Sequence, residues 1–146
     1  MVSEASTAQK KKQIAIYSDD SSVRAAVILA LGNRIAEDLP EHEIHEFATG
    51  AALRQYIDHK SQDGTFKIDL FILDGEATPE GGLGVARQLK DEVFNCPPVL
   101  AITGRKEDAW LAAWSKVEAS VIHPIDPFTL ARTVAELLRA GSLTSA

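Results

Sequence analysis

Residues able to bind a metal or a phosphate stand directly after four apolar stretches of this chain. They are Ser18, Asp19 and Asp20 after QIAIY, Asp74 and Glu76 after LFIL, Thr103 after VLAI, and His123 after ASVI. Carboxylate, carbonyl and water oxygens are the ligands that Mg²⁺ takes in proteins. We therefore expect a single polar site if the fold brings the ends of these stretches together.

Asp74 carries most of this expectation. It ends the apolar stretch 70–73 and precedes a glycine-rich loop. Burying a carboxylate costs free energy unless a partner offsets the loss of water. Such an acid either caps a solvated turn or faces a metal, a phosphate or a substrate. We interpret Asp74 as a member of a site.

The elements that position these residues alternate along the chain. We predict strands at 13–17, 43–47, 68–73, 98–102 and 119–122. We predict helices after a Ser21 or Ser22 cap, at 50–59, 82–93 and 107–116, and after an Asp126 cap. This alternation predicts an α/β fold with a parallel sheet covered on both faces. Right-handed crossovers leave few strand orders, and we expect the flavodoxin-like order 2-1-3-4-5. Its site lies beyond the carboxyl ends of the strands, where the candidate residues stand.

Length and composition limit the functions to consider. The 146 residues suit one domain, which we place at 12–141, with a disordered leader at 1–11 and a tail at 142–146. A net charge of −6 argues against nucleic acid as a partner. No stretch is long enough to span a membrane, and Cys96 is the only cysteine. We expect a cytoplasmic chain.

Four segments, in this order and spacing, resemble the CheY-like receiver domain of bacterial two-component response regulators. They are IAIYSDDSSVR, DLFILDGEATPEGGLGVARQLK, PPVLAITG and VIHPIDPFTL, and the similarity spans about residues 13–140. It implies that Asp74 accepts a phosphoryl group from a sensor histidine kinase or a small phosphodonor. It also implies that Asp19 and the main-chain carbonyl of Glu76 hold Mg²⁺ with Asp74, and that Thr103 bonds the phosphoryl group.

The chain departs from the family's pattern at several functional positions. Ser18 replaces one of two adjacent acids, His123 replaces the lysine before proline, Ser120 replaces an aromatic residue, and Thr78 stands where the loop proline is usual. One lost acid lowers the charge available to Mg²⁺, although Asp20 is a further candidate ligand. Histidine is shorter than lysine and only partly charged near neutral pH. We therefore predict an atypical receiver in which phosphorylation is weak or absent. By the resemblance, the bond before Pro124 is expected to be cis.

Alternatives remain for single residues and for the whole chain. Asp19 also suits a helix cap, Thr103 a bond to local backbone, and His123 a purely structural place. A conventional receiver, phosphorylated at Asp74, is the second hypothesis. The third is a phosphatase, because DGEAT is similar to the D-x-D-x-[TV] loop of haloacid-dehalogenase-type enzymes. In those enzymes the loop follows the first core strand, whereas in this chain DGEAT follows the third predicted strand. We therefore predict that the chain is not an enzyme.

Trp110 and Trp114 are the candidate partner surface. Their spacing of four residues places them on one face of the helix predicted at 107–116. The family uses its fourth helix, fifth strand and fifth helix for dimerisation and output. In this chain the fourth of these helices is the one predicted at 107–116. We predict that the two tryptophans contact a partner protein or a second copy of this chain; packing into the core is the alternative. No output domain is expected after residue 140, so output would pass through protein contact.

Overall fold

The structure is a computed structural model that describes residues 10–145, with the exception of 79 and 105–112. In chain order the elements are β1 (Lys12–Tyr17), α2 (Ser21–Leu31), β2 (His42–Phe47), α3 (Gly50–Gln62), β3 (Leu70–Asp74), α4 (Gly82–Glu92), β4 (Val99–Thr103), β5 (Ala119–Ile122) and α6 (Pro127–Ser145). All paired strands are parallel, and their order is β2-β1-β3-β4-β5. The predicted flavodoxin-like sheet is confirmed.

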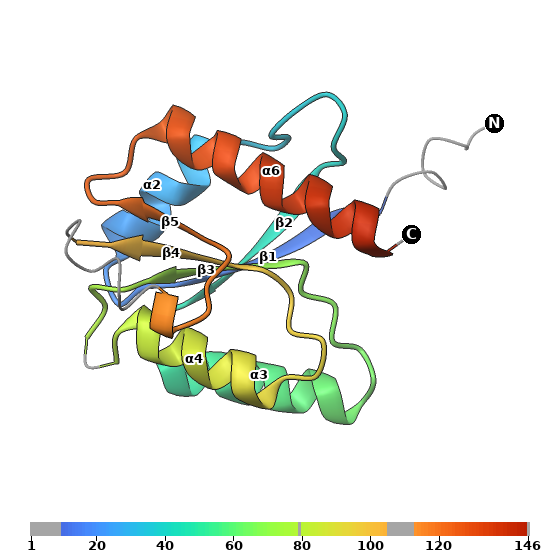
Figure 1. Cartoon of the computed structure of the whole chain (residues 1–146), viewed down its shortest axis with the longest axis vertical. Helices are drawn as coiled ribbons and strands as arrows, with labels where there is room; N and C mark the ends of the chain where they lie inside the picture. Colours follow the sequence, from blue (N-terminus) through green and yellow to red (C-terminus); the bar gives the residue numbers. More distant parts are fainter. Residues whose placement is uncertain (1–9, 79, 105–112, 146) are drawn as a thin grey trace.

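Helices cover both faces of the sheet (Figure 1). Helices α2 and α6 lie on one face, and α3 and α4 lie on the other. The central strands β3 and β4 are buried along their whole length, which accounts for their unbroken apolar sequences. No helix in the described part of the chain has the length and apolar character of a membrane span.

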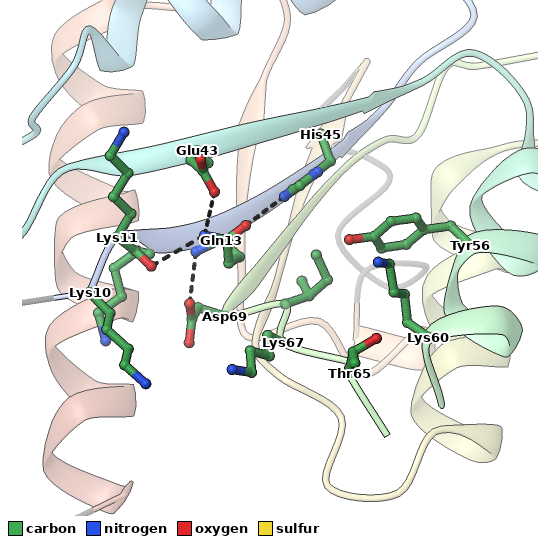
Figure 2. Close-up of a pocket in the computed structure, with 12 residues that line it drawn as sticks. Lys10, Lys11, Gln13, Glu43, His45, Tyr56, Lys60, Thr65, Lys67 and Asp69 are labelled. Carbon is green, nitrogen blue, oxygen red and sulfur yellow. Dashed lines mark hydrogen bonds between the residues drawn. The ribbon is translucent and has the colours of Figure 1, made fainter. Parts of the chain in front are cut away.

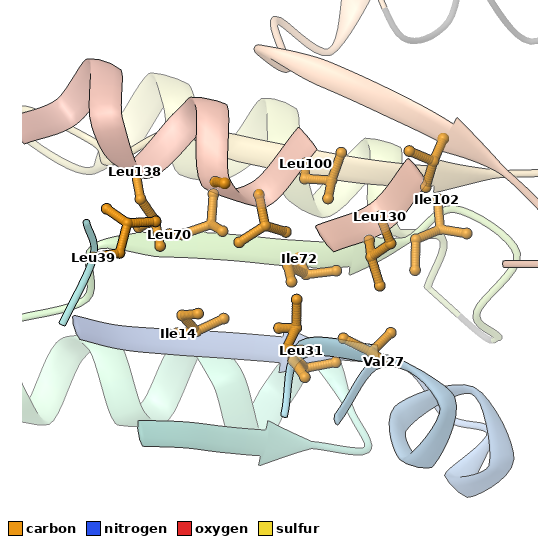
Figure 3. Packing of buried hydrophobic residues seen from close by; sticks show 14 residues of the cluster. Ile14, Val27, Leu31, Leu39, Leu70, Ile72, Leu100, Ile102, Leu130 and Leu138 are labelled. Atoms are coloured by element: carbon orange, nitrogen blue, oxygen red, sulfur yellow. The ribbon is translucent and has the colours of Figure 1, made fainter. Parts of the chain in front are cut away.

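Two apolar layers form the core, because successive strand side chains point to opposite faces. Ile14, Ile72 and Leu100 pack with residues of α2 and α6, such as Leu31 and Leu130, in the layer of Figure 3. Along each strand, the alternate residues belong to the other layer and face α3 and α4. They are Ala15, Tyr17, Phe71, Leu73 and Val99. Packed apolar side chains thereby cover both faces of the sheet.

The N-cap of helix α2 differs from the prediction. Asp20, rather than Ser21 or Ser22, is the N-cap, and its carboxylate accepts a hydrogen bond from the Ser22 main-chain N–H at 2.8 Å. The helix stops at Leu31 because Gly32 adopts a positive φ of 58°, a conformation that side chains disfavour. Asp126 caps the last helix as predicted, accepting from the Thr129 N–H at 2.9 Å.

Other boundaries differ by a few residues. Strand β3 begins at Leu70 and includes Asp74, and α3 extends to Gln62. Helix α6 continues to Ser145, so the predicted boundary at 141 falls inside it. Most of the helix predicted at 107–116, and most of the leader predicted at 1–11, lie outside the described residues.

Candidate functional site

A pocket opens at the carboxyl ends of β1, β3 and β5. Four carboxylates and one imidazole line it: Asp19, Asp20, Asp74, Glu76 and His123. Five of the candidate residues therefore gather at one end of the sheet, as the strand order predicts.

The Asp74 carboxylate is buried and hydrogen-bonded on both oxygens. Its side chain is only 4% exposed. Oδ2 accepts a hydrogen bond from the Ser18 hydroxyl at 2.7 Å, and Oδ1 accepts one from the Glu76 main-chain N–H at 2.9 Å. His123 Nε2 lies 2.9 Å from Oδ1. These contacts provide the partners that a buried carboxylate requires.

Ser18 is the partner of Asp74 that the sequence did not reveal. The sheet register pairs Tyr17 with Leu73, so the next residues of the two strands, Ser18 and Asp74, lie side by side. Ser18 is completely buried, and its hydroxyl also accepts a hydrogen bond from the Asp20 N–H at 3.1 Å. The residue that replaces a family acid thus holds the acceptor-position carboxylate directly.

The loop after β3 is fixed at two points. Thr78 donates to the Asp19 carboxylate through its main-chain N–H at 3.2 Å and its hydroxyl at 3.1 Å. Arg54 on α3 binds both oxygens of Glu80 at 3.0 Å. The Tyr17 hydroxyl donates to the Glu80 main-chain oxygen at 2.5 Å. Thr78 stands where the family usually has proline, and in this chain it occupies both oxygens of Asp19.

Two glycines allow close contacts around the pocket. A Cβ at Gly82 would lie 2.6 Å from the main-chain oxygen of Asp74, so α4 can begin against β3 only with glycine at this position. A Cβ at Gly104 would lie 2.6 Å from the Glu76 carboxylate carbon, which places the Glu76 side chain against this glycine.

Thr103 is close to the pocket but does not line it. It is buried at the end of β4, and its hydroxyl donates to the Val121 main-chain oxygen at 3.4 Å. This bond goes to the backbone of the neighbouring strand β5, not to backbone near Thr103 in the sequence, which was the alternative. Ser120, at the family's aromatic position, is exposed on β5.

The His123–Pro124 peptide bond is cis, which confirms the expectation drawn from the resemblance. The His123 main-chain N–H donates to the Thr103 oxygen at 2.8 Å, which fixes the start of this segment against β4. Its side chain, 23% exposed, then reaches Asp74 from the solvent side of the pocket.

The acids of the pocket already accept hydrogen bonds within the protein, so a Mg²⁺ ion would have to share them. Both oxygens of Asp74 and both oxygens of Asp19 already accept hydrogen bonds. Asp20 is engaged as the cap of α2, and its hydrogen bonds from Ser22 lower its pKa. Within the described residues, no group of three or more acidic, histidine or cysteine side chains is placed to hold a metal ion.

Of the two tryptophans predicted as a partner surface, Trp110 lies outside the described residues. Trp114 is 47% exposed. The Arg87 guanidinium on α4 lies 5.2 Å from the centre of its ring, and Arg87 Nη1 donates to the Trp114 main-chain oxygen at 2.9 Å. Trp114 therefore packs partly against α4 and leaves about half of its surface in contact with solvent.

Comparison with known proteins gives close relatives in sequence and a wider group in structure. No family model matches the chain. Two curated proteins from two strains of Mycobacterium tuberculosis, both named uncharacterized response regulatory proteins, are each 52% identical to it over 128 residues. The match covers 88% of this chain and 92% of each relative.

Solved structures share the fold at lower sequence identity. A CheY-like response regulator receiver domain protein from Methanospirillum hungatei has a TM-score of 0.71 and 18% identity, with 92% of this chain and 99% of that chain covered. The signal receiver domain of a Luxo repressor protein from Vibrio parahaemolyticus has a TM-score of 0.73 and 19% identity, with 93% and 96% covered. At these identities the likeness establishes the fold alone.

Proposed function

Because the chain belongs to the response regulator receiver domains of two-component signalling, we propose that it signals through protein contacts with little or no phosphorylation of Asp74. The observation that carries this proposal is the set of hydrogen bonds and the imidazole contact that already surround that carboxylate. Each of its oxygens accepts a hydrogen bond from Ser18 or from the Glu76 N–H, and His123 stands 2.9 Å away on the solvent side.

The chemistry of phosphoryl transfer supports the proposal. Transfer depends on positioned cations that stabilise charge on the moving phosphoryl group. The neutral Ser18 hydroxyl cannot supply the charge of a second acid to a metal ion. A lysine side chain, which the family has before its proline, would bring a permanent charge on a longer stem. We propose that Mg²⁺ binds this pocket weakly for the same reasons.

The test is intact-protein mass spectrometry after incubation with acetyl phosphate and Mg²⁺. We expect a small or undetectable phosphorylated fraction in the wild type. The double variant Ser18→Asp with His123→Lys restores the family residues and should gain a phosphorylated fraction, which the further change Asp74→Asn abolishes. Stoichiometric, long-lived modification of the wild type would contradict the proposal and favour a conventional receiver.

A conventional receiver is the second candidate, because Asp74 does border an open pocket together with Asp19 and His123. Receiver domains are generally signalling proteins rather than enzymes, so the phosphatase hypothesis has the least support. Turnover of a generic aryl phosphate, lost in Asp74→Asn, would revive it.

A partner protein, with a histidine kinase as one candidate, is proposed to bind the face that carries Trp114. Ile122 on β5 and Phe128 at the start of α6 are also exposed, at 42% and 82%. Exposed tryptophan is a frequent anchor of protein interfaces, and truncating such an anchor costs about 2 kcal/mol or more of binding free energy. A second copy of this chain is the alternative partner.

The partner surface is tested by analytical ultracentrifugation and by pull-down with purified candidate kinases. Trp114→Ala should abolish association, while the free energy of unfolding changes little because the ring is half exposed. Phe94→Ala is the matched control, since Phe94 is 88% exposed at the end of α4 and outside this face. Equal loss of association in both variants would contradict the assignment.

A further inference from the structure

A second pocket lies at the end of the sheet opposite Asp74, where β1 and β3 begin. Five of the chain's eight lysines line it, and we call it the lysine pocket: Lys10, Lys11, Lys12, Lys60 and Lys67. They come from the residues at the start of β1, from α3 and from the residues before β3. In a chain with a net charge of −6, this cluster is a local reversal of sign.

The two carboxylates of the lysine pocket are engaged by Gln13. Asp69 Oδ2 accepts from the Gln13 main-chain N–H, and Glu43 Oε1 accepts from Gln13 Nε2, both at 2.8 Å. Figure 2 shows both acids pointing at Gln13. Within the described part of the chain, no ion pair joins Lys10, Lys11 or Lys67 to a carboxylate. Their charge is therefore available to an external anion.

Tyr56 adds a hydrogen-bond donor to the lysine pocket. Its ring lies between His45, at a centroid distance of 5.6 Å, and the Lys60 ammonium, 5.7 Å from the ring centre. Figure 2 shows its hydroxyl directed toward the middle of the pocket. Burial, and next the Glu43 carboxylate, raise the pKa of Tyr56, so the hydroxyl stays protonated at neutral pH. It is thus a permanent donor.

His45 is held in a fixed orientation beside Tyr56. Its Nε2 lies 2.7 Å from the Gln13 side-chain oxygen. An amide oxygen only accepts hydrogen bonds, so this nitrogen carries the proton. The wall of the lysine pocket is therefore ordered before any ligand arrives, which reduces the entropy lost on binding.

The arrangement of the charges indicates the class of ligand. In Figure 2, Lys10 and Lys11 lie on one side of Asp69, and Lys60 and Lys67 lie on the other. Each lysine carries its ammonium on a flexible four-carbon stem, so groups on both sides of the pocket can turn toward a compact anion. A membrane or a nucleic-acid duplex needs such groups along an extended surface. Lysine binds phosphate as a point charge without demanding one geometry. We propose that the lysine pocket binds a small anion that carries two or more phosphate groups.

The experiment is isothermal titration calorimetry of the full chain with sodium tripolyphosphate at low ionic strength. The wild type should bind one equivalent. Lys11→Gln with Lys67→Gln removes two exposed ammonium groups from opposite sides of the pocket and should weaken binding about tenfold or more. Arg34→Gln with Arg132→Gln is the matched control, because both arginines are exposed, lie outside the pocket and remove the same charge. It should change the affinity by less than about twofold.

Titrations with other phosphate-containing ligands show which kind of molecule supplies the phosphate groups. Equal affinity for ATP and tripolyphosphate supports a site for phosphate groups alone, and tighter binding of ATP supports a nucleotide that also contacts Tyr56. No binding of tripolyphosphate by the folded wild type overturns the proposal, as does equal weakening in the arginine control. Binding to phosphatidylserine vesicles without binding to tripolyphosphate overturns it in favour of a membrane surface. None of these outcomes depends on whether Asp74 is phosphorylated.

Discussion

At the carboxyl end of the sheet, Asp74 accepts hydrogen bonds from Ser18 and the Glu76 N–H, and His123 contacts it from the solvent side. At the amino end, Lys11 and Lys67 are exposed, and within the described residues neither forms an ion pair. The carboxylate at the carboxyl end is bound by hydrogen bonds inside the protein, whereas the ammonium groups at the amino end are exposed to solvent.

The difference follows from where the residues sit in the strands. Ser18 and Asp74 are adjacent through the register of β1 and β3, so the sheet buries them together and each must find a partner inside the protein. Lys10, Lys11 and Lys67 precede the strands, where long side chains reach water without cost. Groups at the carboxyl end therefore contribute to folding, and groups at the amino end remain free for a ligand.

The largest effect should come from Ser18→Ala. It removes the donor to Asp74 Oδ2 and leaves a buried carboxylate oxygen unpaired, which should lower the free energy of unfolding by about 2 kcal/mol. Ser61→Ala, at an exposed position on α3, should change it by less than about 0.5 kcal/mol. Urea unfolding followed by circular dichroism measures both. Equal stability of the two variants would remove the distinction between the two ends.

His42 is an exception at the amino end, because this first residue of β2 is buried and neither of its ring nitrogens has a hydrogen-bond partner among the described residues. Burial lowers the pKa of His42 below its usual 6.5. The unfolded chain therefore binds more protons than the folded chain, and stability falls as the pH drops below about 6.5 toward the lowered pKa.

The measurement compares urea unfolding at several pH values between 5 and 8. The variant His42→Leu should flatten the decline in stability toward low pH. The other histidines are shared by both proteins, so the difference between wild type and variant isolates His42. An identical pH dependence in the two proteins would show that its protonation is not linked to folding.

A smaller effect is expected from Thr78→Val. This change removes the hydroxyl that donates to Asp19 Oδ2 but keeps the main-chain N–H bond to Oδ1. Because the contact is exposed, we expect a loss of about 0.5–1 kcal/mol. Thr78→Ser keeps a hydroxyl and should recover part of this loss. No loss in Thr78→Val, which keeps the methyl group and lacks the hydroxyl, would show that the hydroxyl contact does not stabilise the fold.

The fold could be predicted from the sequence because apolar strands alternate with helical patterns. Such an alternation forms a parallel sheet in which the helices connect the strands and cover both faces. The same logic placed Asp19, Asp74 and His123 at one end. It could not find the Ser18–Asp74 bond, which depends on the register of two strands 56 residues apart. Neither could it find the Thr78–Asp19 bonds, since the path of a loop is set by tertiary contacts such as the Arg54–Glu80 pair.

The lysine pocket was also out of reach of the sequence alone. Lys10 and Lys11 fall in the leader that the sequence predicts to be disordered. Nothing in the spacing of Lys10 to Lys12 connects them with Lys60 or Lys67. The parallel sheet brings the start of β1 and the start of β3 to the same edge, and α3, which covers one face of the sheet, adds Lys60. Clusters of this kind arise from topology, so they appear only when the fold is known.

The smallest effect on stability is expected from Lys11→Gln with Lys67→Gln, the pair that should weaken anion binding most. Both side chains are exposed, and among the described residues neither forms an ion pair that the substitutions could break. Removing two like charges that lie near each other also relieves their repulsion. We expect the free energy of unfolding to stay the same or to rise by less than about 0.5 kcal/mol. Added salt screens the repulsion and should reduce any gain. A loss of more than about 1 kcal/mol in urea unfolding would show that these lysines hold the amino end of the sheet together, and the contrast with Ser18 would then fail.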